Sequence, residues 1–268
     1  ANTSFFAILL GSDNGGTTTP TDASVTKAKL ADEIDIFAGT SLNAADLGTG
    51  IHIKLLDSGA SVSSDANDLI LENSRAGMSF LSATDNYGII NFGDSGDNNI
   101  GQILYYHGDN SLSFVNNAQT GIKLNTDGEV TKPLQPAFQV HPASNQDNVS
   151  SGAQVVFGTE RFDIGSNFAS NTFTAPVTGK YQLNLNLRLA QMDQVVYTLL
   201  QIETSNKSYQ SIIDSGALDE DADYWTFNIH VIADMDANDT ADVHFYQNGG
   251  TAQVDINTES YFSGVLVC

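Results

Sequence analysis

Alternating apolar and polar residues in the C-terminal half of the chain predict long β-strands. In residues 180–189 every second side chain is Tyr or Leu and those between are polar, a period of two that is typical of a half-buried strand. The same period returns at residues 195–202, 224–232, 241–246 and 260–267, with polar turns between them. Strands with this spacing are typical of an antiparallel sandwich. We therefore expect a compact β-sandwich domain.

The preceding part of the chain alternates over shorter stretches. Glycines or polar turns introduce short predicted strands at residues 51–55, 69–71, 78–81, 89–92, 100–106, 112–115 and 122–124. Strands this short cannot close a core alone, so neighbouring repeats or neighbouring chains must cover their apolar faces. Residues 50–131 are therefore predicted to form an elongated β-repeat shaft, and Pro133 and Pro136 mark its boundary with the sandwich at residues 132–268.

The N-terminal region lacks a strand pattern. An apolar stretch at residues 5–10 precedes a Gly- and Thr-rich connector, so residues 1–24 are interpreted as a docking segment and flexible connector. Residues 25–49 contain Leu30, Ile34 and Phe37 at helical spacing and are predicted to be a short helical or coil neck. No apolar run approaches the roughly 20 residues of a membrane-spanning helix, so no membrane insertion is expected.

Composition and charge narrow the class of protein. Charged residues make up only 16% of the chain, and Asn, Ser, Thr and Gly supply the remaining polarity, which favours strands and turns over helices. The fold class is therefore predicted to be all-β. The net charge of −22 repels polyphosphate, so nucleic acid is excluded as a partner. The single cysteine, Cys268, cannot form an intrachain disulfide.

Several motifs of the predicted sandwich belong to a known pattern. They are Phe168, the Phe-Thr-Ala-Pro-Val-Thr-Gly-Lys-Tyr run at residues 173–181, the turn and strand at 238–243, and Tyr-Phe-Ser-Gly-Val-Leu at 261–266. Together they resemble the tumour-necrosis-factor-like jelly roll of complement component 1q-type heads. The resemblance implies a homotrimeric head, made with two identical chains, that carries both chain ends at its base.

Upstream motifs resemble a second family. Residues 25–32 and 45–50, and above all 92–101 and 105–114, are similar to repeats in tail or virion fibres of marine, cyanophage-like bacteriophages. A fibre repeat followed by a trimeric head implies an intertwined homotrimer on a virion, assembled in the host cytoplasm and exposed outside it. Its expected partners are other virion proteins at the N-terminus and a bacterial surface glycan or protein at the head.

Antiparallel connectivity predicts which loops meet a receptor. If the last strand runs toward the shaft, the loops at residues 191–194, 214–223 and 247–257 lie at the far end of the head. The loops at 176–178, 205–207 and 234–238 then face the shaft. The far loops offer polar groups and an aromatic platform suited to sugar hydroxyls or to a protein loop. The predicted receptor-binding residues are Asp193, Asp219, Asp221, Tyr224, Asn248 and Gln253.

Two acidic segments are candidates for calcium. Five carboxylates lie in residues 214–223, and clustered oxygen ligands suit calcium, although a solvated loop is the alternative reading. The predicted calcium ligands are Asp219, Glu220, Asp221 and Asp223; no other cofactor is expected. Residues 234–239 begin like a calcium loop but lack its glycine, which favours a hairpin turn. His230 and His244 are expected to lie on adjacent strands, but no third ligand is evident, which favours structural roles.

Enzyme signatures are weak. The Gly-Asp-Ser-Gly-Asp run at residues 93–97 is similar to the nucleophile loop of chymotrypsin-like proteases, but the surroundings of His52 do not match that family's base, so Ser95 is interpreted as a turn residue. We therefore expect no enzyme. The sequence favours a fibre that attaches to a bacterial receptor; the alternatives are a structural neck, collar or capsid-decorating fibre and, as a minor one, a polysaccharide depolymerase with paired carboxylates.

Overall fold

The chain folds almost entirely as β-strands. The computed structural model describes residues 41–42 and 51–268, and this part of the chain contains no α-helix. The prediction of an all-β protein is therefore confirmed. Within these residues no helix is long and apolar enough to cross a membrane. The chain divides into two compact units, Ala1–Ser79 and Phe80–Cys268. The docking segment predicted at residues 1–24 and nearly all of the neck at 25–49 lie outside the described residues.

The first unit contains a small three-stranded sheet. It is made of β1 (Ser41–Leu42), β2 (Ile51–Lys54) and β3 (Leu69–Glu72). β2 pairs antiparallel with β1 and parallel with β3. The strands predicted at residues 51–55 and 69–71 are therefore confirmed within one or two residues.

Glu72, at the end of β3, fastens the loop between β2 and β3 to this sheet. Its buried carboxylate accepts hydrogen bonds from the Ser58 backbone N–H at 2.7 Å and the Ser58 hydroxyl at 2.9 Å. His52 Nε2 lies 2.9 Å away and Lys54 Nζ 3.4 Å away. The Ser58 N–H, as the largest cause, together with the Ser58 hydroxyl and the Lys54 ammonium, lowers the pKa of Glu72 to about 2, against its ordinary 4.5.

The depressed pKa of Glu72 predicts an acid-sensitive contact. Because the folded-state pKa lies below the unfolded one, the carboxylate stabilises this unit above pH 4.5 and loses that effect as the pH falls toward 2. The Ser58 amide resonance, followed by NMR, is expected to titrate with a midpoint near 2. In a Glu72→Gln variant the same resonance should show no transition in this window. A Ser58 midpoint at 4.5 in the unmodified chain would contradict the assignment.

The second unit begins with an antiparallel meander. Its strands run in order β4 (Tyr87–Phe92), β5 (Gly101–Tyr106), β6 (Ser111–Asn116), β7 (Gln119–Leu124) and β8 (Val130–Thr131). Four predicted strands are thereby confirmed. The strand predicted at residues 78–81 is wrong: this segment pairs with no strand, and Leu81 is 95% exposed. The apolar residues there have no neighbouring backbone that could complete a ladder.

One face of this meander is apolar and open. Ile90, Ile103, Phe114 and Ile122 are successive cross-strand partners, so their side chains share one face of the sheet. Phe114 is 46% exposed and Ile122 40% exposed. One chain therefore leaves this face largely uncovered, as expected of a segment whose core is completed by something else.

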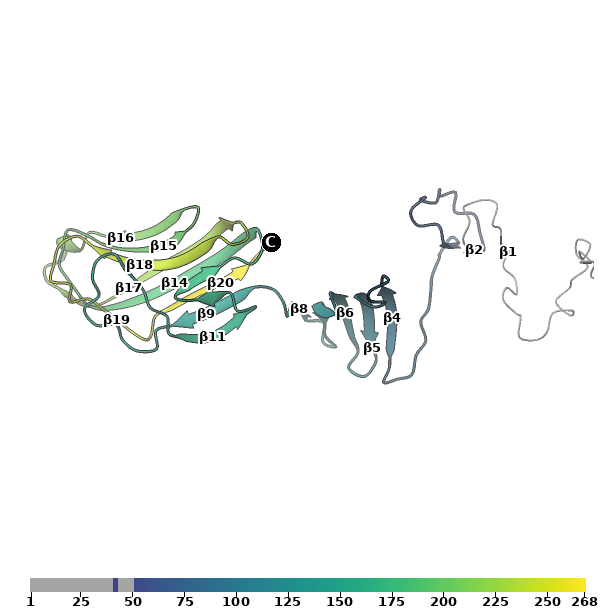
Figure 1. The fold of residues 1–268 in the computed structure, drawn as a ribbon, viewed down its shortest axis with the longest axis horizontal. Helices are drawn as coiled ribbons and strands as arrows, with labels where there is room; N and C mark the ends of the chain where they lie inside the picture. The colour runs from purple at the N-terminus through teal and green to yellow at the C-terminus, as the bar shows by residue number, and fades with distance from the viewer. Residues whose placement is uncertain (1–40, 43–50) are drawn as a thin grey trace, which may run out of the picture. The chain divides into compact units, whose positions relative to one another are not determined.

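Two packed sheets form the remainder of the second unit (Figure 1). One has the order β11-β9-β20-β14-β17, with β19 beside β14; the other has β12-β13-β18-β15-β16, with β10 beside β18. The chain crosses from one sheet to the other between β14 and β15, between β16 and β17 and again between β17 and β18, which is typical of the Greek-key connections of a jelly roll. The bounds are β9 (Ala137–His141), β10 (Ala153–Gln154), β11 (Thr159–Ile164), β12 (Phe168–Ala169), β13 (Thr172–Thr174), β14 (Gly179–Met192), β15 (Thr198–Thr204), β16 (Ser208–Ile213), β17 (Ala222–Met235), β18 (Thr240–Gln247), β19 (Asp255–Ile256) and β20 (Tyr261–Leu266), with a 3₁₀ turn at Ser215–Ala217.

The core lies between these sheets and follows the two-residue period. Every apolar residue that the pattern of β14 assigns to one face is fully buried. The Tyr181 hydroxyl, at the edge of this core, donates to the Val177 carbonyl at 2.7 Å, which satisfies its polar atom. From the opposite sheet, β15 and β18 contribute the fully buried residues Leu200, Ile202, Val243 and Phe245.

Gly264 in β20 permits the closest approach in this core. A Cβ atom built there would lie 2.5 Å from Cε1 of Phe138 and 2.9 Å from Cδ2 of Leu183. Both neighbours are fully buried and cannot move into solvent. The Phe-Ser-Gly sequence at residues 262–264 thus packs an aromatic ring inward while the glycine lets a second one lie against the backbone.

Both ends of the sandwich chain lie at one end of the domain. The Leu266 N–H donates to the Pro136 carbonyl at 3.0 Å, and the Lys180 N–H donates to the Cys268 carbonyl at 2.7 Å. The loops predicted to lie on this side are joined as well. The Ala237 backbone N–H donates to Thr178 Oγ1, and Nδ2 of the Asn206 side chain donates to the Asp234 carbonyl. This end is called the basal end below.

Candidate functional site

Three loops meet at the end of the sandwich opposite to the basal end. β14 and β17 pair along their whole length, from Gly179 opposite Met235 at the basal end to Met192 opposite Ala222 at the other. The loops that follow β14, precede β17 and follow β18 are therefore gathered at this distal end, as the connectivity predicted (Figure 1).

Asp221 ties these three loops together. Its Oδ1 accepts a hydrogen bond from the Gln194 backbone N–H at 2.7 Å, and its Oδ2 accepts one from Gln253 Nε2 at 2.9 Å. The Gln194 bond, followed by that of Gln253, holds the pKa of Asp221 below its ordinary value. Two predicted binding residues, Asp221 and Gln253, are thus held in direct contact, and Asp221 stays ionised in mildly acidic solution.

Asp193 is a correction to the predicted receptor-binding set. It is only 4% exposed, so a receptor cannot reach it. Its carboxylate accepts hydrogen bonds from Gln247 Nε2 at 2.9 Å and from the N–H and Oγ1 of Thr251, both at 3.1 Å. These donors account for the burial of a charged group, because a buried carboxylate requires partners. Asp193 therefore positions the loop after β18 from beneath.

Tyr224 is a large aromatic side chain exposed near the distal end. It is 62% exposed at the start of β17, and the Arg188 guanidinium carbon lies 4.8 Å from its ring centroid. This cation–π contact restrains the ring while leaving the tyrosine accessible. Asn248 is also exposed, and its backbone N–H donates to the Tyr197 carbonyl at 3.0 Å. The name distal surface is used below for the accessible side chains of Asp219, Asp221, Tyr224, Asn248 and Gln253.

The predicted calcium ligands do not converge. Asp219, Glu220, Asp221 and Asp223 are all exposed around an open depression of about 530 Å³. No three of their carboxylates come within bonding range of one ion in this arrangement; among the described residues, the group that does is a different one. Calcium binding by this loop stays a prediction.

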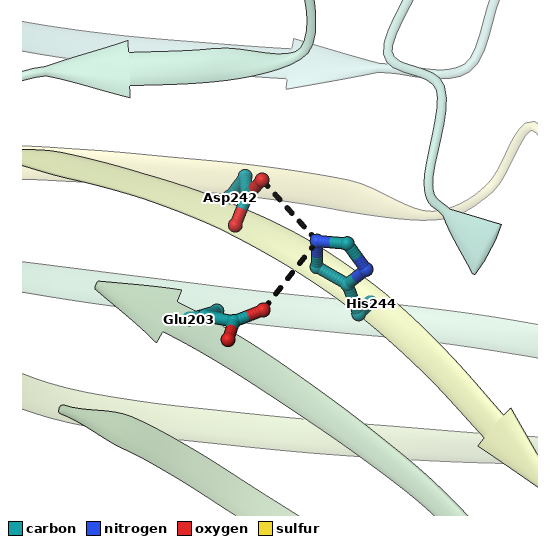
Figure 2. Close-up of side chains that lie close together, drawn as sticks. All are labelled: Glu203, Asp242 and His244. Carbon is teal, nitrogen blue, oxygen red and sulfur yellow. Dashed lines mark hydrogen bonds and ion pairs between the residues drawn. The ribbon is translucent and has the colours of Figure 1, made fainter. Parts of the chain in front are cut away.

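That other group is Glu203, Asp242 and His244, on the outer face of the second sheet (Figure 2). His244 Nε2 lies 3.3 Å from Asp242 Oδ2 and 3.6 Å from Glu203 Oε2. The prediction that His230 and His244 lie on adjacent strands is wrong. The structure puts them on different sheets, because β17 crosses to β18 on the other layer. The sequence did contain one signal of this group: the Asp-x-His spacing at residues 242–244 places both side chains on the same face of a strand.

Two other motifs behave as turns. Asp94 Oδ1 accepts from the N–H groups of Gly96 and Asp97 at 2.7 and 3.0 Å, which places Ser95 at the tip of an Asx turn. Residues 234–239 join β17 to β18, and Asp239 Oδ2 accepts from the Asp236 N–H at 2.8 Å. Both turn interpretations are confirmed.

The proteins similar to this chain were found among solved structures. No protein-family model matches the chain, and no curated protein does. Among solved structures, the globular domain of zebrafish complement 1qA is 14% identical, with 50% of this chain and 98% of that one covered and a TM-score of 0.38. Eiger TNF from S. frugiperda is 14% identical (50% and 93% covered, TM-score 0.41), and murine APRIL is 10% identical (50% and 99% covered, TM-score 0.37). The jelly roll itself follows from the strand order and pairing within this chain.

Proposed function

We propose that this chain is one protomer of a homotrimeric virion fibre, and that its C-terminal head attaches to a bacterial surface receptor through the distal surface. The observation that carries the proposal is the difference between the two ends of the sandwich. The chain enters and leaves at the basal end, while Asp221 fastens three loops at the distal end. A fibre head needs this arrangement, since its base connects to the shaft and its opposite end meets the ligand.

The open apolar face of the β4–β8 meander supports assembly with identical chains. Burial of this face would remove apolar surface of four adjacent strands from water, at about 25 cal/mol per Å². In a symmetric trimer, two further copies of the chain would place the same apolar strands at the same level along the shaft, where the three apolar faces can cover one another. Threefold repetition of the distal surface then converts weak contacts with sugar hydroxyls into avidity.

The proposal is tested with purified full-length protein. Light scattering coupled to size exclusion should give the mass of three chains, with and without a calcium chelator. The same sample should bind marine bacterial cells from a panel of candidate hosts. A Tyr224→Ala variant should keep the trimer mass and bind roughly ten-fold more weakly or worse, because exposed tyrosines restrained in this way often dominate an interface.

Ile232→Ala is the matched control. Ile232 lies on the same strand as Tyr224 and is also 62% exposed, but it lies toward the basal end. Its replacement should leave cell binding unchanged. A measured mass of one chain would overturn the proposal of a trimeric fibre. A trimer that binds no cells would leave the structural neck or collar reading, and release of reducing sugar from envelope glycans would identify a depolymerase.

A further inference from the structure

We propose that Glu203, Asp242 and His244 form a binding site for a divalent transition-metal cation of the zinc type. The site lies on the outer face of the β12-β13-β18-β15-β16 sheet and is independent of the distal surface and of the proposed function. Figure 2 shows the two carboxylates converging on the same imidazole nitrogen. All three potential ligand atoms lie within 4.8 Å of one another.

The strand register places two negative charges against each other. Glu203 on β15 and Asp242 on β18 are direct cross-strand partners, so their side chains leave the same face side by side. Like charges directly opposite each other destabilise a sheet. His244, two residues beyond Asp242 on β18, projects from the same face. A cation between the three side chains would remove this repulsion.

The imidazole of His244 lies between acceptors on both sides. Nδ1 lies 3.4 Å from the Gly152 carbonyl oxygen, and Nε2 lies 3.3 Å from Asp242 Oδ2. An ion held between the carboxylates would take the Nε2 lone pair, and Nδ1 would then carry the proton that the Gly152 carbonyl accepts. Three electron-pair donors facing one another form the ligand set of a metal ion, and an Nδ1–H bond to a backbone carbonyl is the usual support of a zinc-binding histidine.

The separations fit an ion better than a direct ion pair. The 3.3 and 3.6 Å from His244 Nε2 to the carboxylates exceed the roughly 2.7–2.9 Å of charge-assisted hydrogen bonds. Tetrahedral zinc with bonds of about 2.0–2.1 Å requires ligand atoms about 3.3–3.4 Å apart. The two distances from His244 therefore fit tetrahedral coordination, and the carboxylate oxygens of Glu203 and Asp242, which lie within 4.8 Å of each other, would draw together around an ion.

The surroundings of the ligand set resemble a supported metal site. Gln154 Nε2 donates to Asp242 Oδ2 at 2.7 Å and so orients that carboxylate. Gln154 comes from β10, which pairs with β18 alongside His244. The side chains are partly exposed, so an ion can enter and a water molecule can complete its coordination. An imidazole nitrogen with carboxylates suits zinc and its neighbours, whereas calcium and magnesium prefer oxygen ligands alone.

Zinc titration of the untagged full-length chain tests the proposal. The experiment uses a Cys268→Ser background, because the exposed Cys268 thiol is a competing soft ligand. Titration calorimetry with zinc chloride should show an equivalent of zinc per chain, and Glu203→Gln or His244→Gln should weaken its binding by roughly a hundred-fold or more, at or above the upper end of the tenfold to hundredfold loss that is typical of supporting residues. Cobalt(II) bound in the same place should give the intense visible absorption of tetrahedral coordination.

His230→Gln is the matched control. His230 is an exposed histidine on the opposite sheet, bonded through Nδ1 to Asn184, and its loss should leave zinc binding unchanged. Circular dichroism of each variant without metal shows whether the fold is kept. The proposal is overturned if the chain binds no zinc. Equal affinity of the His244→Gln variant would overturn it as well.

Discussion

Replacement of Gly264 by valine is expected to destabilise the sandwich by about 3 kcal/mol or more, the upper part of the range for overpacked cores. A Cβ atom alone would overlap Phe138 and Leu183, and valine adds two further methyl groups in the same space. Both neighbours are held between the sheets, so relief requires the sheet itself to shift. Because domains are stable by only about 5–15 kcal/mol, much of the variant is expected to be unfolded or poorly expressed.

Trp225 provides the measurement. It is the single tryptophan of the chain and packs against the core from β17, so its fluorescence during urea denaturation reports unfolding of this domain. The control is Ser263→Val, which adds a β-branched side chain one residue earlier, on the other face of β20. That variant should change the free energy of unfolding by only about 0.5 kcal/mol. Equal stability of the two variants would contradict the close approach at Gly264.

The long strands were predictable because the alternation of apolar and polar residues that marks each strand lies within one short stretch of sequence. The alternation at residues 180–189 predicted most of β14, and the predicted apolar face is the buried one. Shorter strands with mixed patterns, such as β9 and β16, escaped prediction. β16 is an edge strand whose only sheet neighbour is β15, so less of its pattern is dictated by burial. Edge strands need fewer apolar residues than strands with neighbours on both sides.

The candidate sites were also predictable only in part: their place in the fold followed from connectivity, but the contacts between residues far apart in the sequence did not. Antiparallel connectivity alone brought the distal loops together, and it correctly placed Asp221 and Gln253 at that end. It could not reveal that Asp193 points inward, because burial depends on Gln247 and Thr251, more than 50 residues later in the chain. The Glu203 and Asp242 pair escaped for a similar reason: their register is set by sheet pairing between β15 and β18, which no local pattern encodes.

Replacement of Asp193 by alanine is expected to loosen the distal end and to cost roughly 2–4 kcal/mol. The change removes the acceptor of the partly buried Thr251 N–H and one of the two acceptors of the Gln247 amide, which keeps only its bond to the Gly249 carbonyl, and a buried donor left unpaired costs about 1–3 kcal/mol. The turn at Gly250 is also built around this carboxylate: its φ is +81°, and a Cβ there would lie 2.5 Å from Asp193 Oδ2. The loop after β18 would therefore lose both its anchor and its shape.

Urea denaturation and amide hydrogen exchange separate the two parts of this expectation. The midpoint for Asp193→Ala should fall, and protection of the Thr251 amide should be lost while that of β14 persists under native conditions. Asp219→Ala is the control for stability, since Asp219 is exposed on a neighbouring distal loop and its loss should change the free energy by no more than about 0.5 kcal/mol. If the receptor meets the distal surface, Asp193→Ala should also weaken cell binding, although no ligand can touch Asp193. Unchanged Thr251 protection in this variant would show that the loop is held by other contacts, and the positioning role of Asp193 would have to be abandoned.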